Sequence, residues 1–140
     1  MKEFTLEIIT QEEHLETETI VSLTVPTESG EITVLQDHVP LFSRLKAGEL
    51  RYKTKSGIES YFALTGGFLD VSPRNIVTVL ADTAIRSDKI NLDKVEQAIA
   101  RAKKALEENK DNKDTLKIER ELRAAILQAS VARKHRNRKN

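Results

Sequence analysis

The chain has 140 residues, of which 39% are hydrophobic, 4% aromatic and 32% charged, a composition typical of a soluble globular protein with one good core or a small core plus an appendage. It contains no cysteine, which excludes disulfides, thiolate metal sites and cysteine nucleophiles. No apolar run approaches the ~18 residues of a membrane-spanning helix, so any membrane association is expected to go through a protein partner.

The net charge of +1 hides a contrast between the two parts of the chain. Residues 1–88 carry 8 Lys and Arg against 14 Asp and Glu, a net charge of −6, whereas residues 89–140 carry 15 against 8, a net charge of +7. This contrast favours two modules with different partners. A solvated basic helix surface is the other interpretation.

The first part of the chain alternates apolar and polar residues as short strands do. The alternating runs are Phe4–Ile8, Ile20–Val25, Ile32–Leu35, Leu50–Lys53, Tyr61–Leu64, Phe68–Val71 and Ile76–Leu80. Turn-forming residues separate the runs, and no helix-length segment lies between them, which disfavours a parallel sheet. We therefore predict an antiparallel β-sandwich or flattened barrel over residues 1–86.

The densest apolar stretch, Tyr61–Asp82, is predicted to form the centre of the sheet. It is interpreted as two strands, Tyr61–Val71 and Asn75–Leu80, joined by a tight turn at Ser72–Arg74. Gly66-Gly67 lies inside the first strand and predicts a bulge, a sharp bend or another backbone passing close. A phosphate-binding role for these glycines is disfavoured, because no helix N-terminus follows them.

The apolar spacing changes to the helical period of 3.6 residues from about Asn91. We predict helices at about 91–106 and 115–134, separated by a loop without apolar residues at 107–114. Asn91, or Asp88 earlier, can cap the first helix. The two helices are predicted to form an antiparallel hairpin within residues 87–140, followed by a basic tail at 133–140. The facing residues are largely Ala, Leu and Ile, so the two helices could pack closely on each other. Their apolar face is narrow and Ala buries little area, so the hairpin is expected to be held to the sandwich only marginally.

No catalytic constellation is evident. His14, His38 and His135 lie far apart, and none has a metal-ligand partner at the required spacing. The basic second helix and tail could bind the phosphates of a nucleic acid, as a free-standing binding module would. They are not interleaved with aromatic residues, and an acidic protein partner is the other interpretation.

Three stretches at specific spacing distinguish this sequence. They are Ser29–Leu41 (SGEITVLQDHVPL), Ala63–Val71 (ALTGGFLDV) and Val77–Ala84 (VTVLADTA). With the helical hairpin behind them, they resemble the epsilon subunit of F-type ATP synthase, the counterpart of the mitochondrial delta subunit. The resemblance covers nearly the whole chain.

The resemblance implies a rotor subunit without an active site, in the central stalk of a proton-translocating ATP synthase. The sandwich is then expected to bind the gamma subunit and to approach the ring of c subunits through the loop at 30–41. Glu31 and His38 are the polar residues implied to contact that ring. The implied location is peripheral, on the cytoplasmic face of a bacterial plasma membrane, with no nucleic acid among the partners.

The resemblance also implies a regulatory role for the helices. Extended into the catalytic head of alpha and beta subunits, they would block ATP hydrolysis. The basic residues implied to meet an acidic loop of the beta subunit are Arg120, Arg123, Arg133 and Lys134.

Two departures from the family pattern alter these expectations. The family commonly has Gly at Thr33 and Pro-Gly at Gln36-Asp37, so the conformation of this loop is expected to differ. Some bacterial members bind ATP through Ile/Leu-Asp-x-x-Arg-Ala at the start of the first helix. Neither Ile90–Val95 nor Leu92–Gln97 supplies that Arg.

We therefore expect no cofactor and weak or absent ATP binding. The residues that could still contact ATP are Asn91, Lys94 and Arg101.

Overall fold

The computed structural model describes residues 2–108 and 114–136. The chain divides into two compact units, residues 1–86 and 87–140. The centre of the predicted 107–114 loop and the end of the predicted basic tail, residues 137–140, lie outside the described residues.

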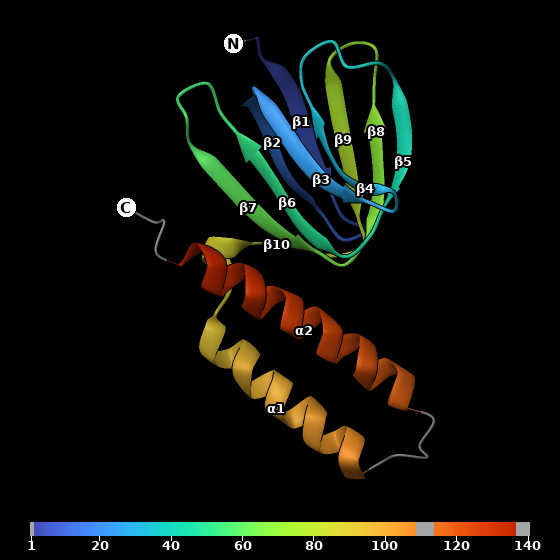
Figure 1. The fold of residues 1–140 in the computed structure, drawn as a ribbon, viewed down its shortest axis with the longest axis vertical. Coiled ribbons are helices and arrows are strands. Elements are labelled where there is room, and N and C mark those ends of the chain that lie inside the picture. Colours follow the sequence, from blue (N-terminus) through green and yellow to red (C-terminus); the bar gives the residue numbers. More distant parts are fainter. Residues whose placement is uncertain (1, 109–113, 137–140) are drawn as a thin grey trace. The chain divides into compact units, whose positions relative to one another are not determined.

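The first unit is a β-unit whose strands curve into a flattened barrel (Figure 1), which confirms the predicted β-sandwich. The strands run in the sheet order β10-β7-β6-β3-β5-β8-β9-β1-β2, and β4 pairs with β3 beside this path. Their bounds are β1 Phe4–Ile9, β2 His14–Ile20, β3 Ser22–Thr27, β4 Gly30–Val34, β5 Leu41–Leu45, β6 Gly48–Lys53, β7 Glu59–Leu64, β8 Gly67–Val71, β9 Ile76–Ala81 and β10 Ala84–Arg86.

One strand pair departs from the predicted antiparallel arrangement. Strands β1 and β9 are parallel, with Leu6 opposite Val77 and Ile8 opposite Val79, whereas the other pairs between described strands are antiparallel. A parallel pair normally needs a crossover connection of a dozen or more residues. Here the strands between β1 and β9 supply that connection, so no helix is required.

Three strands were not predicted from the sequence, for a common reason. Strands β2 and β5 each bury one residue and β10 buries none, so none of them shows a clear alternation of buried apolar and exposed polar residues. The predicted strand Tyr61–Val71 is in fact two strands, since Thr65 and Gly66 separate β7 from β8. The two halves pair with different neighbours, β7 with β6 and β10, and β8 with β5 and β9.

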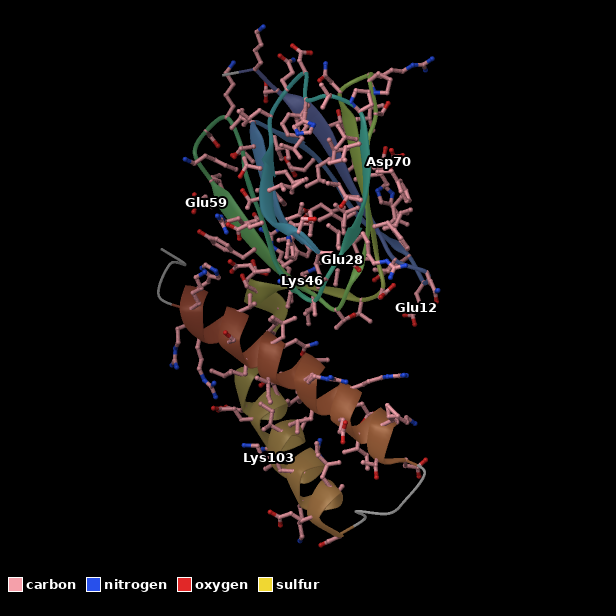
Figure 2. All side chains as sticks on the ribbon, turned by 45° about the vertical axis from the view of Figure 1, so that its right-hand side comes forward. Glu12, Glu28, Lys46, Glu59, Asp70 and Lys103 are labelled. Carbon is pink, nitrogen blue, oxygen red and sulfur yellow. The ribbon has the colours of Figure 1, made fainter. Side chains whose placement is uncertain are left out.

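Alternate side chains of the strands meet in one apolar core. Its members include the fully buried Leu6, Ile8, Leu23, Leu50, Leu64, Leu69 and Val79. Charged side chains such as Glu59 and Asp70 point away from the sandwich (Figure 2). Burial of this apolar area is the main stabilising contribution to the unit.

Gly67 marks the closest backbone approach in the sheet. Its φ is +145°, and a Cβ added there would lie 2.1 Å from the carbonyl oxygen of Leu80. Any other residue would push β8 away from β9, because real Cβ atoms do not approach an oxygen so closely. Of the three explanations that the glycine pair suggested, the close approach of another backbone applies at Gly67.

The second unit consists of a short 3₁₀ helix, Ser87–Lys89, and two helices, α1 Leu92–Glu108 and α2 Thr115–His135, which pack against each other (Figure 1). Asn91 caps α1, because its Oδ1 accepts a hydrogen bond from the Lys94 N–H at 3.2 Å. None of the residues of α1 is fully buried. The predicted tail begins too early, since α2 continues to His135.

Candidate interaction surfaces

The first candidate surface lies on the outer face of β5, β8 and β9. Phe42 and Phe68 are 64% and 38% exposed, and their rings stack with centroids 5.5 Å apart. The guanidinium of Arg44 lies 5.7 Å from the centre of the Phe68 ring. Leu80, 42% exposed, is directly opposite Phe68 in the β8–β9 ladder. Exposed aromatic residues that are already stacked and flanked by a guanidinium form a surface suited to a protein partner.

This surface was not identified from the sequence, although a signal was present. In Ile76–Leu80, Val77 and Val79 face inward, while two of the three outward positions, Ile76 and Leu80, are also apolar. A strand that is apolar on both faces needs a cover on the second face. From the sequence, these apolar residues were interpreted as a strand buried at the centre of the sheet, not as an exposed surface.

The two residues implied to contact a ring of c subunits occupy different settings. Glu31 lies on β4 and accepts two hydrogen bonds of 3.1 Å from Arg51 of β6. This interaction raises the pKa of Arg51. His38 lies in the loop between β4 and β5, where its Nδ1 is 2.7 Å from the carbonyl oxygen of Val39. Both positions are accessible, but the carboxylate of Glu31 is already engaged by a cation.

The loop that carries His38 presents apolar side chains to solvent. Leu35 is 53% exposed and Val39 is 72% exposed. A main-chain hydrogen bond of 3.2 Å from the His38 N–H to the carbonyl oxygen of Leu35 closes a turn between them. The loop therefore offers both an imidazole and aliphatic groups to a partner.

The four basic residues implied to contact a beta subunit do not share one face of α2. Arg120, Arg123 and Lys134 are exposed, and their separations of 3, 11 and 14 residues return them to one side of a helix. Arg133 is directed to α1, where its Nη2 donates to Glu96 Oε2 at 2.5 Å. The basic face of α2 therefore consists of three of the predicted residues.

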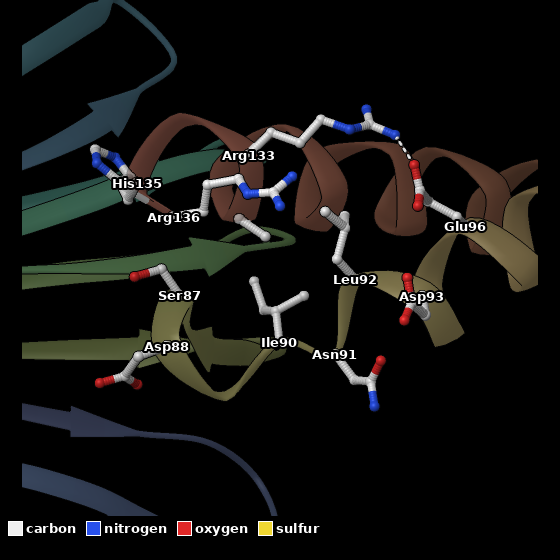
Figure 3. A pocket seen from close by; sticks show the side chains of 11 residues that line it. Ser87, Asp88, Ile90, Asn91, Leu92, Asp93, Glu96, Arg133, His135 and Arg136 are labelled. Atoms are coloured by element: carbon white, nitrogen blue, oxygen red, sulfur yellow. Dashed lines mark hydrogen bonds and ion pairs between the residues drawn. The ribbon is translucent and has the colours of Figure 1, made fainter. Parts of the chain in front are cut away.

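The ATP candidates are not gathered into one pocket. Asn91 lines a cavity of about 390 Å³ between the start of α1 and the end of α2 (Figure 3), whereas Arg101 lines a separate cavity farther along the hairpin. Lys94 contributes its backbone N–H to the cap of α1. In the first cavity, the dashed line in Figure 3 shows Arg133 engaged by Glu96. A carboxylate therefore engages one of the two guanidinium groups, those of Arg133 and Arg136, that line this cavity.

Partly buried polar side chains join the two edge strands of the sheet. Arg86 at the end of β10 donates to Glu16 of β2 at 3.0 Å and to Ser60 of β7 at 3.3 Å. The hydroxyl of Tyr52, on β6, donates to the other oxygen of Glu16 at 2.6 Å. Burial and the carboxylate together raise the pKa of Tyr52 to about 12.

Within residues 2–108 and 114–136, no group of three or more His, Asp or Glu side chains is placed to hold a metal ion. Neither α1 nor α2, over their described residues, is long and apolar enough to cross a membrane.

Comparison with known proteins gives consistent matches. The family described as "ATP synthase, Delta/Epsilon chain, beta-sandwich domain" matches residues 3–87. The ATP synthase epsilon chain of Herpetosiphon aurantiacus is 38% identical over 133 residues, which cover 95% of this chain and 96% of that one. The epsilon chain of Natranaerobius thermophilus is 36% identical over 137 residues, covering 97% and 96%.

A solved structure shows the same fold at lower identity. A chain in the mitochondrial ATP synthase of Euglena gracilis, determined with its OSCP, F1 and c-ring, matches with a TM-score of 0.72 and 23% identity. The match covers 95% of this chain and 82% of that chain.

The raised pKa of Tyr52 predicts a loss of stability in alkali. The unfolded chain loses the tyrosine proton near pH 10, whereas the folded chain retains it to about pH 12. The folded state therefore binds more protons between these values, and stability falls as the pH rises through them. The loss attributable to Tyr52 is at most about 2 to 3 kcal/mol, and urea unfolding between pH 8 and pH 11.5 measures it.

Tyr52→Phe is the matched variant, because it keeps the ring and removes the hydroxyl. Its stability should decline less steeply over the same pH range. Parallel declines in the variant and the unmodified chain would contradict the assignment to Tyr52.

The Glu96–Arg133 ion pair predicts that ATP binds this chain weakly, with no saturable heat in isothermal titration at submillimolar ATP. Glu96→Arg removes the competing carboxylate and adds a cation beside the cavity, so it should increase the affinity for ATP. Glu96→Gln is the control that removes the carboxylate from Arg133 without introducing a new cation, and its affinity for ATP should be intermediate. Tight binding of ATP by the unmodified chain would contradict this interpretation of the cavity.

Proposed function

The chain belongs to the ATP synthase epsilon chain family of non-catalytic stalk subunits, and from this membership we propose that it couples the gamma subunit to the c-ring and restrains ATP hydrolysis. In this role it is a peripheral protein on the cytoplasmic face of the membrane, bound there through its partner subunits. It uses proton-driven rotation without an active site or cofactor of its own.

The exposed Phe42–Phe68 stack is the observation that carries the proposed contact with gamma. These rings and Leu80 cover adjacent strands of one sheet face, so their apolar area is contiguous in the ladder. Stacked aromatic side chains lose little conformational entropy on binding, and aromatic and arginine residues are enriched at the centres of interfaces. The outer face of β5, β8 and β9 is therefore the gamma-binding surface in this proposal.

The β4–β5 loop supports the proposed contact with the c-ring. It combines the exposed side chains of Leu35 and Val39 with the imidazole of His38. Glu31 contributes through its ion pair with Arg51, which also pairs with Glu49, so this group is polar and carries one more carboxylate than guanidinium. A loop with both apolar and polar side chains suits the c-ring, because in this proposal the polar loops of the c subunits stand above the membrane.

The helical unit supports the proposed restraint on hydrolysis. Helix α1 has no fully buried residue, and the Arg133–Glu96 pair that joins it to α2 is about half exposed. Exposed ion pairs contribute only ~0–1 kcal/mol, so this pair does little to fix the helices in their present arrangement. The basic face of Arg120, Arg123 and Lys134 would then bind an acidic segment of the catalytic head.

The first prediction from this proposal concerns gamma binding. Replacing Phe42 and Phe68 by Ser removes the stack and should weaken binding of gamma by at least about tenfold, since interface aromatic residues often contribute 2 kcal/mol or more. Binding is measured by titration of purified gamma. Both side chains point outward, so the fold should persist.

Ile58→Ser is the matched control, because Ile58 is 62% exposed and lies outside β5, β8 and β9. It should leave gamma binding unchanged. Equal weakening by Ile58→Ser, or no weakening by the double Phe variant, would count against this surface.

A second prediction concerns the helices. A chain truncated after Asp88 retains the whole core cluster of the β-unit and should still assemble with ATP synthase. It should raise ATP hydrolysis by the complex, because the helices that block the catalytic head are gone. The full chain carrying Arg120→Gln and Arg123→Gln should raise hydrolysis in the same direction by a smaller amount.

Lys103→Gln serves as the charge control, since Lys103 is an exposed cation on α1 rather than on the basic face of α2. Hydrolysis that remains unchanged on truncation, in a complex shown to contain the truncated chain, would refute the inhibitory role.

A further inference from the structure

Two non-glycine residues of the described chain have a positive φ, and they lie opposite each other. Asp37 has a φ of 64° in the β4–β5 loop, and Asn75 has a φ of 59° in the β8–β9 turn. The left-handed region is unfavourable for residues with a Cβ, and Asp and Asn tolerate it best. Two such residues in contact indicate that the surrounding structure holds both in place.

Reciprocal hydrogen bonds connect these two residues. The backbone N–H of Asp37 donates to Asn75 Oδ1 at 2.7 Å, and Asn75 Nδ2 donates to Asp37 Oδ1 at 3.1 Å. One of the two bonds involves a carboxylate, which makes it stronger than a neutral pair. The pair thus links a loop to a turn that is 38 residues away in the chain.

Both sides of the pair are tied to the start of the chain. The carbonyl oxygen of Asn75 accepts a hydrogen bond of 3.0 Å from the N–H of Thr5 on β1. Beside Asp37, the Gln36 side chain donates to the carbonyl oxygen of Glu3 at 2.9 Å. Two consecutive loop residues are therefore fixed to two segments that are themselves ordered.

These ties hold the part of the loop that presents its side chains to solvent. Leu35 and Val39 flank the tied residues, and His38 follows directly after Asp37. The family resemblance leads one to expect Gly at Asp37, and the observed φ is one that Gly adopts readily. An Asp at this position keeps the left-handed conformation and adds a side chain that restrains it.

We infer that Asp37 and Asn75 form a brace that presets the Leu35–Pro40 loop for docking, and that Asn75 is a positioning residue for the partner of that loop. This inference rests on the proposed function, in which the loop meets the polar face of the c-ring. A loop that is already ordered loses less conformational entropy on binding, so the brace raises affinity without touching the partner.

The test first replaces the amide of Asn75 by a carboxylate, which cannot donate a hydrogen bond to Asp37. Asn75→Asp keeps the size of the side chain and its tolerance of positive φ, but it places a second carboxylate opposite Asp37. The amide protons of residues 35–39 should then exchange at least about fivefold faster, as expected from the loss of one hydrogen bond. Binding of the full chain to ATP synthase stripped of this subunit should weaken by about two- to tenfold, the range expected for ordering one or two residues.

A second substitution should reverse both effects. In the double variant Asp37→Asn/Asn75→Asp, the new amide can donate to the new carboxylate, so slow exchange and tight binding should return. Asp37→Asn alone is the matched control, because its amide oxygen still accepts from Asn75 Nδ2. The thermal midpoint of each variant separates loop effects from general destabilisation.

The outcomes distinguish this inference from the proposed function. If the unmodified chain does not bind the stripped complex, the proposed function fails. If it binds and Asn75→Asp speeds loop exchange without weakening binding, the brace has no positioning role. Unchanged exchange in Asn75→Asp, or failure of the double variant to recover, also overturns the inference while leaving the proposed function in place.

Discussion

The close approach of Gly67 to the Leu80 carbonyl is the constraint on which both sandwich surfaces depend. Because no Cβ stands between them, β8 can pair with β9 from Gly67 onward. This register places Phe68 opposite Leu80 on the outer face and Leu69 opposite Val79 in the core. The apolar surface and the buried core are thus two faces of one ladder.

The same register determines where the β8–β9 turn ends. The ladder closes with Val71 opposite Val77, which leaves a short connection that ends at Asn75. Asn75 then lies against Asp37 and hydrogen-bonds Thr5 of β1 through its carbonyl group. A local steric requirement in one strand pair therefore influences a loop whose residues are distant in the chain.

The two units achieve order by different physical means. In the β-unit, the apolar core is supplemented by the Glu16–Arg86 pair, which joins the edge strands β2 and β10 where no backbone ladder does. Tyr52 and Ser60, which bond to this pair, are buried, and the low local dielectric strengthens the hydrogen bonds that they make. In the helical unit, α1 has no buried residue, α2 buries Ala129, Val131, Ala132 and His135, and the ion pair between the helices is exposed. A β-unit with a large buried core and a helical unit with few buried residues fit the proposed division between a coupling element and a regulatory one.

The sequence by itself determined the fold class, because alternation with period 2 and spacing with period 3.6 follow directly from the geometry of strands and helices. It also offered Asn91 as one of two possible caps and a close backbone approach as one of three explanations of Gly66-Gly67, since both depend on local chemistry. The family resemblance, read from residues 29–41, 63–71 and 77–84, was confirmed by the comparisons with known proteins.

Only the tertiary structure decided which residues act together. The parallel pairing of β1 with β9, the stack of Phe42 on Phe68 and the brace between Asp37 and Asn75 join positions far apart in the chain. Arg133 resembled its basic neighbours in sequence, but packing of α2 on α1 paired it with Glu96 instead. Local patterns specify how each segment folds, whereas long-range contacts depend on strand order and register, which no local pattern encodes.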